Sequence, residues 1–166
     1  MEDLIKKGKQ HLVQKEYKES IDAFSRAIKN GEKSSEVYRS RGVAYVMISD
    51  YQNACKDFDE AIRLDPRNAR AYYNRGLVYL QLKEYEKALE DFDEALRINP
   101  TYAPAYLAKA RIYQILGNKR KLEENLKMVI RLGDARLQKS LNIYDERRIR
   151  EKLKEIIRYE KKFNDR

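Results

Sequence analysis

Apolar residues in the stretch 69–100 recur every three or four positions, in two runs that a short polar turn separates. This spacing is typical of two α-helices that each bury one face. The turn is the polar segment Lys83–Tyr85, and Asn99 before Pro100 ends the second run because the residue before a proline is disfavoured in a helix. The pattern therefore predicts a helix–turn–helix unit. Its apolar positions are Tyr72, Gly76, Tyr79 and Leu80 in the first helix and Ala88, Leu89, Phe92, Ala95 and Leu96 in the second.

The same pattern recurs along the chain at a step of 34 residues. Recurrence at a fixed step of this length indicates stacked structural repeats, so the chain is predicted to be all-α. Glycine and alanine where two helices cross let the backbones approach closely, and aromatic side chains fill the remaining space. The positions in register are Gly8, Gly42 and Gly76, with Ala110 in the fourth place; Phe24, Phe58 and Phe92; Ala27, Ala61 and Ala95; Tyr17, Tyr51 and Tyr85; Tyr38, Tyr72 and Tyr106; and Tyr45, Tyr79 and Tyr113.

These shared residues resemble the tetratricopeptide repeat, a 34-residue helix–turn–helix unit. Residues 69–102 and 35–68 match its pattern closely, although Arg75 stands where the family usually has leucine. Residues 1–34 are a weaker copy, and residues 103–136 are a degenerate one. The matching residues are Tyr72, Gly76, Tyr79, Ala88, Phe92, Ala95 and Pro100 in one close copy, and Tyr38, Gly42, Tyr45, Ala54, Phe58, Ala61 and Pro66 in the other.

The resemblance implies a right-handed solenoid of about four helix–turn–helix repeats, in residues 1–136. After residue 136 the register is lost, and residues 137–166 contain a charged segment with an apolar stripe. A stacked array needs a terminal unit with a polar outer face, so we interpret 137–166 as a C-terminal capping helix region. A membrane-surface helix and a dimerising segment are the alternatives, and the interleaved acids weaken the first of these. The stripe consists of Ile149, Leu153, Ile156, Ile157 and Phe163.

Charge and composition narrow the class of protein. Residues 1–102 carry 18 Lys and Arg and 18 Asp and Glu, so the net charge of +9 arises in residues 103–166. This basic end suggests nucleic acid as an alternative partner, but we do not expect it, because the repeat already uses most tyrosines for packing. We identify neither a signal peptide nor a run of about 18 apolar residues that could span a membrane. With the single Cys55, these features favour a cytoplasmic protein.

The sequence offers no catalytic or metal-binding motif, so we predict neither enzyme activity nor a cofactor. His11 occupies a position where other repeats have tyrosine, which favours a packing role. Cys55 lies on a predicted second helix, and we expect it to be a small core residue. The acids of Asp57–Ala61 and Asp91–Ala95, both DFDEA, recur beside core residues in two repeats. We interpret these acids as a solvated outer face rather than a metal site.

Binding of a partner is therefore the expected function. The resemblance implies that the first helices of the repeats line a concave groove. Helical periodicity then selects the groove positions within each repeat. The surface has an aliphatic floor with several cations and few acids, which suits a protein or peptide partner of acidic character. Self-association, with the groove receiving a helix of a second copy, is an alternative. The candidate binding residues are Lys6, Lys9, Arg39, Ser40, Val43, Arg70, Tyr73, Asn74, Leu77 and Arg111.

Asn74 is of particular interest because its amide can donate to and accept from a peptide backbone. Exposure to solvent, or a hydrogen bond to a neighbouring helix, would explain an asparagine at this position equally well. Chaperone-binding members of the resembled family grip a C-terminal carboxylate with five Lys, Asn and Arg residues on three first helices. Neither frame of this chain supplies that set, so we predict that it does not bind such tails in that way. The two frames read Ile5, Lys9, Ser40, Arg70 and Asn74, or Arg39, Val43, Asn74, Pro104 and Ala108.

Overall fold

The computed structural model describes residues 3–132, and within this range the chain folds into eight α-helices with no strand. This confirms the predicted all-α fold. The predicted capping region at 137–166 lies outside the described residues. The helices are α1 (Leu4–Val13), α2 (Tyr17–Lys29), α3 (Ser35–Met47), α4 (Tyr51–Leu64), α5 (Ala69–Gln81), α6 (Tyr85–Ile98), α7 (Ala103–Ile115) and α8 (Lys119–Arg131).

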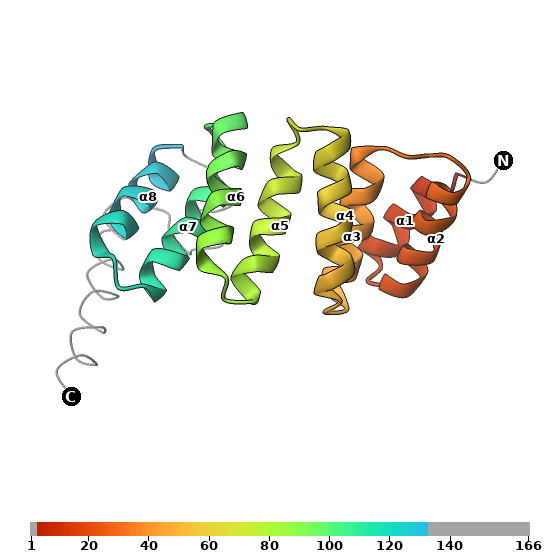
Figure 1. Cartoon of the computed structure of the whole chain (residues 1–166), viewed down its shortest axis with the longest axis horizontal. Coiled ribbons are helices and arrows are strands. Elements are labelled where there is room, and N and C mark those ends of the chain that lie inside the picture. Colours follow the sequence, from red (N-terminus) through yellow and green to blue (C-terminus); the bar gives the residue numbers. More distant parts are fainter. Residues whose placement is uncertain (1–2, 133–166) are drawn as a thin grey trace.

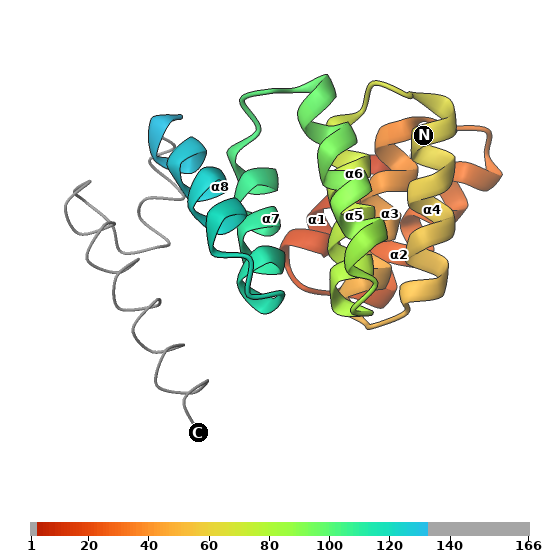
Figure 2. The same ribbon diagram turned by 60° about the vertical axis from the view of Figure 1, so that its left-hand side comes forward.

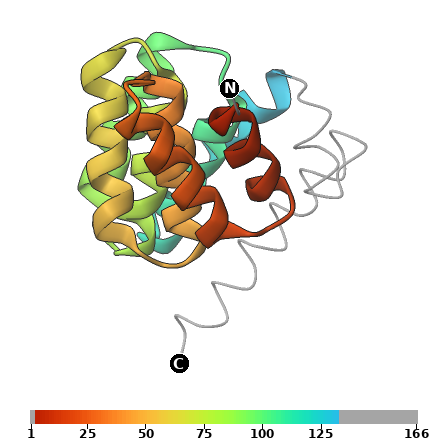
Figure 3. The same ribbon diagram turned by 90° about the vertical axis from the view of Figure 1, so that its right-hand side faces the viewer.

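The helices form four hairpins that follow one another along the long axis of the molecule (Figure 1). The turns inside the hairpins lie along one edge of this row, and the connections between hairpins lie along the opposite edge (Figures 1 and 2). Figure 3 looks along the row, with α1 and α2 nearest the viewer. The first helices α1, α3, α5 and α7 also contact one another from hairpin to hairpin, more extensively than the second helices do. The first helices therefore lie on the inner side of the curve.

Each of the first three hairpins is closed by a phenylalanine that packs onto a glycine. Phe24, Phe58 and Phe92 are fully buried. A Cβ atom added to Gly76 would stand 2.7 Å from the ring of Phe92, and Gly8 and Gly42 are similarly tight. In the fourth hairpin, the buried Ala110 and the smaller Leu126 occupy the corresponding positions. Alanine in place of glycine and leucine in place of phenylalanine fit together, because a leucine leaves room for the methyl group that a phenylalanine excludes.

The four turns inside the hairpins share one backbone conformation. Lys15, Ser49, Lys83 and Gly117 stand 34 residues apart, and each has a positive φ between 60° and 67°. In the third turn, the N–H of Lys83 donates to the Leu80 carbonyl, and the next N–H donates to the Tyr79 carbonyl. This is the Schellman ending of a helix, in which the left-handed residue usually is glycine. Here three of the four turns tolerate a side chain in that conformation.

The structure corrects the interpretation of the DFDEA acids as a solvated face for the first acid of each stretch, whereas Asp59 and Asp93 are exposed. Asp57 and Asp91 are buried, with only 4% and 5% of their surface exposed. Arg41 donates to both carboxylate oxygens of Asp57 at 2.8 and 2.7 Å, and Arg75 donates to those of Asp91 at 2.9 and 2.7 Å. Arg75, which departs from the family pattern, is therefore the partner of a buried acid.

Both arginines, and Lys109 on α7, also reach back to the preceding hairpin. Arg75 bonds Asp59 at 2.6 Å, Arg41 bonds Ser25 at 3.0 Å, and Lys109 pairs with Asp93. Burial raises the pKa of the Asp91 carboxyl, while the Arg75 guanidinium opposes this effect. These contacts form three groups, one at each junction between neighbouring hairpins, and together we call them the charge ladder. It consists of Ser25, Asp59 and Asp93, of Arg41, Arg75 and Lys109, and of Asp57 and Asp91.

Candidate functional site

The inner side of the row presents a continuous stripe of α5. Arg70, Asn74 and Leu77 stand four and three residues apart, so they lie on one face of this helix. Tyr73 adjoins this face. The stripe connects two surfaces of different chemistry, a group of cations on one side and an apolar pocket on the other.

The group of cations surrounds a single acid, and we call it the basic cluster: Lys9, Glu36, Arg39 and Arg70. Arg39 donates to both oxygens of Glu36 at 2.8 and 3.0 Å, and the Lys9 ammonium lies 3.9 Å from the same carboxylate. Burial opposes ionisation of Glu36, but Arg39, Lys9 and Arg70 outweigh it and lower the pKa of this acid. Three cations face one acid, so the cluster keeps a positive excess for an anionic ligand.

Asn74 lies one helical turn beyond Arg70, and its amide nitrogen is buried. This nitrogen has no hydrogen-bond partner among the residues that the structure describes. A buried N–H group without a partner costs about 1–3 kcal/mol relative to a bonded one. The orphaned donor therefore distinguishes Asn74 from an asparagine that is satisfied by a neighbouring helix.

Tyr73 joins the two surfaces. Its ring packs against Phe92 with a centroid distance of 5.7 Å and meets the ring of Tyr102 edge-on at 5.1 Å. Burial, with a smaller contribution from Tyr102, raises the pKa of Tyr73 to about 12. Tyr102 precedes α7 and is itself influenced by the charges of Arg70 and Arg39. The aromatic pair thus stands between the basic cluster and the pocket.

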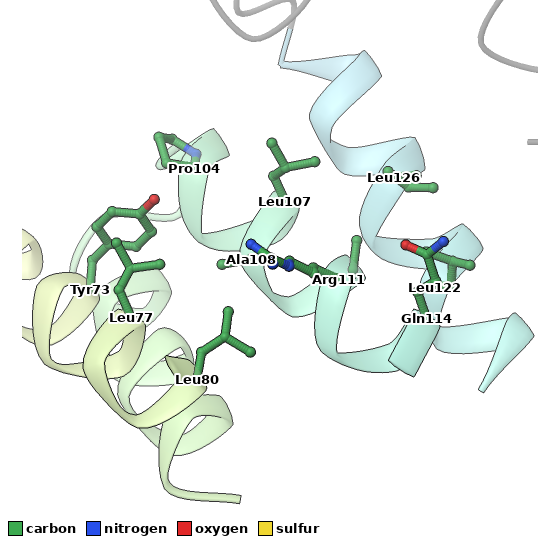
Figure 4. Close-up of a pocket in the computed structure, with 11 residues that line it drawn as sticks. Tyr73, Leu77, Leu80, Pro104, Leu107, Ala108, Arg111, Gln114, Leu122 and Leu126 are labelled. Atoms are coloured by element: carbon green, nitrogen blue, oxygen red, sulfur yellow. The ribbon is translucent and has the colours of Figure 1, made fainter. Parts of the chain in front are cut away.

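The pocket is formed by α5, α7 and α8 and has a volume of about 410 Å³ (Figure 4). Its wall is mostly apolar, and Arg111 is the charged side chain in it. Figure 4 shows Tyr73, Leu77 and Leu80 on α5 facing Leu107 and Arg111 on α7. The lining residues are Tyr73, Leu77, Leu80, Pro104, Leu107, Ala108, Ala110, Arg111, Gln114, Leu122 and Leu126.

The structure groups the predicted binding residues into two sets. Lys9, Arg39 and Arg70 meet at the basic cluster, and Tyr73, Leu77 and Arg111 line the pocket, with Asn74 on the stripe between them. Lys6 is exposed on α1, outside both sets.

Two of the predicted binding residues also take part in packing. Ser40 is buried, with 4% of its surface exposed, and presents little surface to a ligand. Val43 packs against the core cluster of Ala54, Phe58 and Val78.

The pocket also contains residues that the sequence did not indicate. Leu122 and Leu126 come from the second helix α8, whereas the prediction considered only first helices. Tyr102 lies in the connection before α7, and the sequence pattern did not mark it as a binding residue. The degenerate apolar pattern of residues 103–136 was the available signal, because it places leucines where the closer copies have alanine and phenylalanine.

The described side chains contain no group of three or more His, Cys, Asp or Glu residues placed to hold a metal ion. Among the helices of residues 3–132, none combines the length and the apolar character that crossing a membrane requires. His11, one of the groups considered for catalysis, bonds Glu16 at the first hairpin turn.

Comparison with known proteins extends the structural result. Models of the tetratricopeptide repeat match residues 5–65 and 69–102, and a TPR repeat model matches residues 48–83. No curated protein matches the sequence. The crystal structure of MamA is similar, with 27% identity and a TM-score of 0.74, over 81% of this chain and 79% of that one.

Two further similar structures contain bound peptides. The first TPR of Spaghetti (RPAP3), bound to the HSP90 peptide SRMEEVD, is 25% identical with a TM-score of 0.66, over 69% of this chain and 90% of that one. The second TPR domain of human RPAP3, in complex with the HSP70 peptide SGPTIEEVD, is 26% identical with a TM-score of 0.63, over 66% and 91%. The matched repeat models, the glycine–phenylalanine hairpins and these structures agree, and the chain belongs to the tetratricopeptide repeat family.

Proposed function

We propose that this protein is a non-catalytic interaction scaffold that binds an acidic segment of a partner protein along its inner surface. The observation that carries the proposal is the orphaned amide nitrogen of Asn74 beside Arg70. Asn74 as a whole is only half-buried, so a turn of its amide toward the inner surface would let a backbone carbonyl of a bound segment accept from this nitrogen and remove the cost of leaving it unpaired.

The cations near Asn74 favour a bound segment that carries negative charge. Arg70 forms no ion pair within residues 3–132, and Lys9 and Arg39 share one acid. Carboxylates on the segment would gain charge-assisted hydrogen bonds from these side chains, each worth roughly 1.5–3 kcal/mol before solvent screening. A few such contacts with some apolar burial are enough for micromolar affinity, which corresponds to about 8 kcal/mol.

The similar structures support the same class of ligand. The peptides bound to the two RPAP3 domains, SRMEEVD and SGPTIEEVD, both carry several acidic residues. Tetratricopeptide repeat proteins generally act in protein binding rather than in catalysis, which agrees with a scaffold. We also propose a cytoplasmic location, because a lone cysteine suits a reducing compartment.

Affinity capture from a nuclease-treated lysate of the source cells tests the proposal. The variant carries Arg39→Glu, Arg70→Glu and Asn74→Ala together. A control variant carries Arg63→Glu, Arg97→Glu and Asn30→Ala, which makes the same charge change on exposed positions of or beside the second helices. We expect wild type and control to retain the same partner, identified by mass spectrometry, and the groove variant to lose it while it stays folded.

Two results would contradict the proposal. One is capture that survives in the folded groove variant, which would place binding elsewhere on the chain. The other is capture that disappears on nuclease treatment alone, since this would indicate a nucleic acid bridge. Circular dichroism and thermal unfolding of all three proteins establish that the comparison is made between folded molecules.

A further inference from the structure

We propose that the pocket between α5, α7 and α8 holds a leucine or similar apolar side chain of the bound segment, and that Arg111 pairs with an acid next to it. This inference rests on the proposed function and specifies its ligand. It predicts an apolar residue within an acidic stretch as the element that is recognised.

The pocket has the size and surface of an anchor site. Its volume of about 410 Å³ lies in the range of roughly 300–1,000 Å³ that is usual for specific ligand sites. Leu77, Leu80 and Leu107 are apolar residues of its wall that are only half-buried. A branched apolar side chain entering from the inner surface would remove their exposed area from water, which favours binding by about 25 cal/mol per Å².

Arg111 gives the pocket its charge preference. It is exposed at the pocket and has no hydrogen bond or ion pair within residues 3–132. Two cations near it on the first helices are paired, Arg75 with Asp91 and Lys109 with Asp93. The helix that carries Arg111, α7, contains no acidic residue at all. An unpaired guanidinium beside an apolar wall therefore favours a ligand that supplies both a carboxylate and an apolar group.

The position of the pocket makes it continuous with the basic cluster. Tyr73 lines the pocket and contacts Tyr102, and Arg70 of the cluster stands three residues before Tyr73 on α5. One bound segment can therefore place its apolar residue in the pocket and its more distant acids on the cluster. The orphaned donor of Asn74 lies on the same stripe of α5, between these two contacts.

A set of three short probes tests the inference on the full chain. The first probe is acetyl-Asp-Leu-Asp-amide. Acetyl-Asn-Leu-Asn-amide lacks its charges, and acetyl-Asp-Ser-Asp-amide lacks its apolar side chain. Binding is followed by the methyl signals of Leu77, Leu80 and Leu107 in carbon–proton NMR spectra, with the exposed Leu64 on α4 as a reference outside the pocket.

We expect saturable shifts of the pocket methyl signals with the acidic leucine probe. The serine probe should bind at least about tenfold more weakly, because the apolar burial is lost. Arg111→Gln should weaken the acidic probe about fivefold and leave the neutral probe unchanged, since only the acidic probe pairs with the guanidinium. Arg120→Gln on the exposed face of α8 makes the same charge change and should have no effect.

Three outcomes would overturn the inference. These are an absence of saturable shifts at the pocket, equal weakening of the acidic and neutral probes by Arg111→Gln, and equal binding of the leucine and serine probes. If residues 133–166 of the chain itself occupied the pocket, the probes would cause no shifts, and this result counts as the first outcome. If the lysate partner still depends on Arg39, Arg70 and Asn74, such a result removes the anchor and leaves the scaffold function standing.

Discussion

Single residues decide how closely the helices of a hairpin approach. The crossing of Gly76 with Phe92 has no space for a Cβ atom, whereas the fourth hairpin combines Ala110 with Leu126. The chain thus contains two solutions to the same packing problem. They differ by one methyl group on one helix and by the size of the facing side chain.

Gly76→Ala should destabilise the protein by about 1–3 kcal/mol, because the new methyl group displaces the Phe92 ring. Adding Phe92→Leu, which recreates the combination of the fourth hairpin, should recover part of that loss. The loss for the double variant should therefore be smaller than the sum of the two single losses by about 1 kcal/mol or more. Urea unfolding of the four proteins measures this difference, and strictly additive losses would show that the ring is not the obstacle.

The left-handed turn residues offer a gain in stability. Lys83 adopts a φ of 60°, which costs a side-chain-bearing residue roughly 1–2 kcal/mol relative to glycine in the same conformation. Lys83→Gly should therefore stabilise the fold by about 0.5–1 kcal/mol after the entropy of the unfolded glycine is counted. Gly117→Ala, at the equivalent turn, should do the reverse. Thermal unfolding of both variants tests the pair, and changes of the same sign would contradict the explanation.

Tyr73 should make stability sensitive to alkaline pH. Burial raises its pKa to about 12, whereas the pKa of an unfolded tyrosine is about 10. The folded state thus favours the neutral phenol, so this contribution is complete below pH 10 and is lost as the pH rises from about 10 to about 12. We expect Tyr73→Phe to lose less stability than wild type over that interval. Urea midpoints from pH 8 to pH 12 measure this, and parallel curves for the two proteins would refute it.

At the scale of the helices, the charge ladder ties each hairpin to its neighbour. Arg75 illustrates this, because it bonds Asp91 within its own hairpin and Asp59 in the preceding one. Burying a charge is unfavourable unless it is well paired, so such a network penalises a hairpin that is rotated out of register. The ladder thereby favours one stacking arrangement of otherwise similar units.

Removal of one partner of the ladder should be more damaging than removal of both. Arg75→Met leaves Asp91 buried without compensation, and we expect a loss of about 3–5 kcal/mol. Adding Asp91→Leu should restore most of it, because no charge then remains buried. Arg97→Met, which breaks an exposed pair with Glu94, serves as the control and should cost less than about 1 kcal/mol. Chemical unfolding distinguishes these cases, and a harmless Arg75→Met would refute the role of the ladder.

Part of this architecture could be predicted from sequence. The recurrence of Gly76 and Phe92 with their counterparts indicated helix pairs, because side-chain size at a crossing is visible in the residue type. The burial of Asp91 was not visible, because a helix shows only the charges on its own face and the partner, Arg75, stands sixteen residues earlier. The pattern marked Tyr73, Leu77 and Arg111, which line the pocket, as candidates, but not Leu122, because Leu122 comes from a second helix whose approach to α7 depends on packing of the whole hairpin.

At the scale of the whole molecule, the inner surface should not act as a chaperone-tail clamp. Ser40 is buried and Val43 is an apolar, half-buried side chain, so neither supplies the polar group that such a clamp requires. We expect the peptide SRMEEVD to bind with no preference for its free C-terminal carboxylate over the amidated form. Fluorescence anisotropy compares the two forms. Binding that needs the free carboxylate and is abolished by Arg70→Ala would contradict this prediction.

The contacts between hairpins also bear on how such a chain changes over generations. The residues that stack one hairpin on the next recur at a constant step, and each hairpin packs on its immediate neighbours. A duplication of residues 69–102 would therefore meet a compatible neighbour on both sides. It would lengthen the inner surface by one helix and copy Arg70 and Asn74 into a new position. Gene duplication can thus extend the recognised segment before any residue of the core has to mutate.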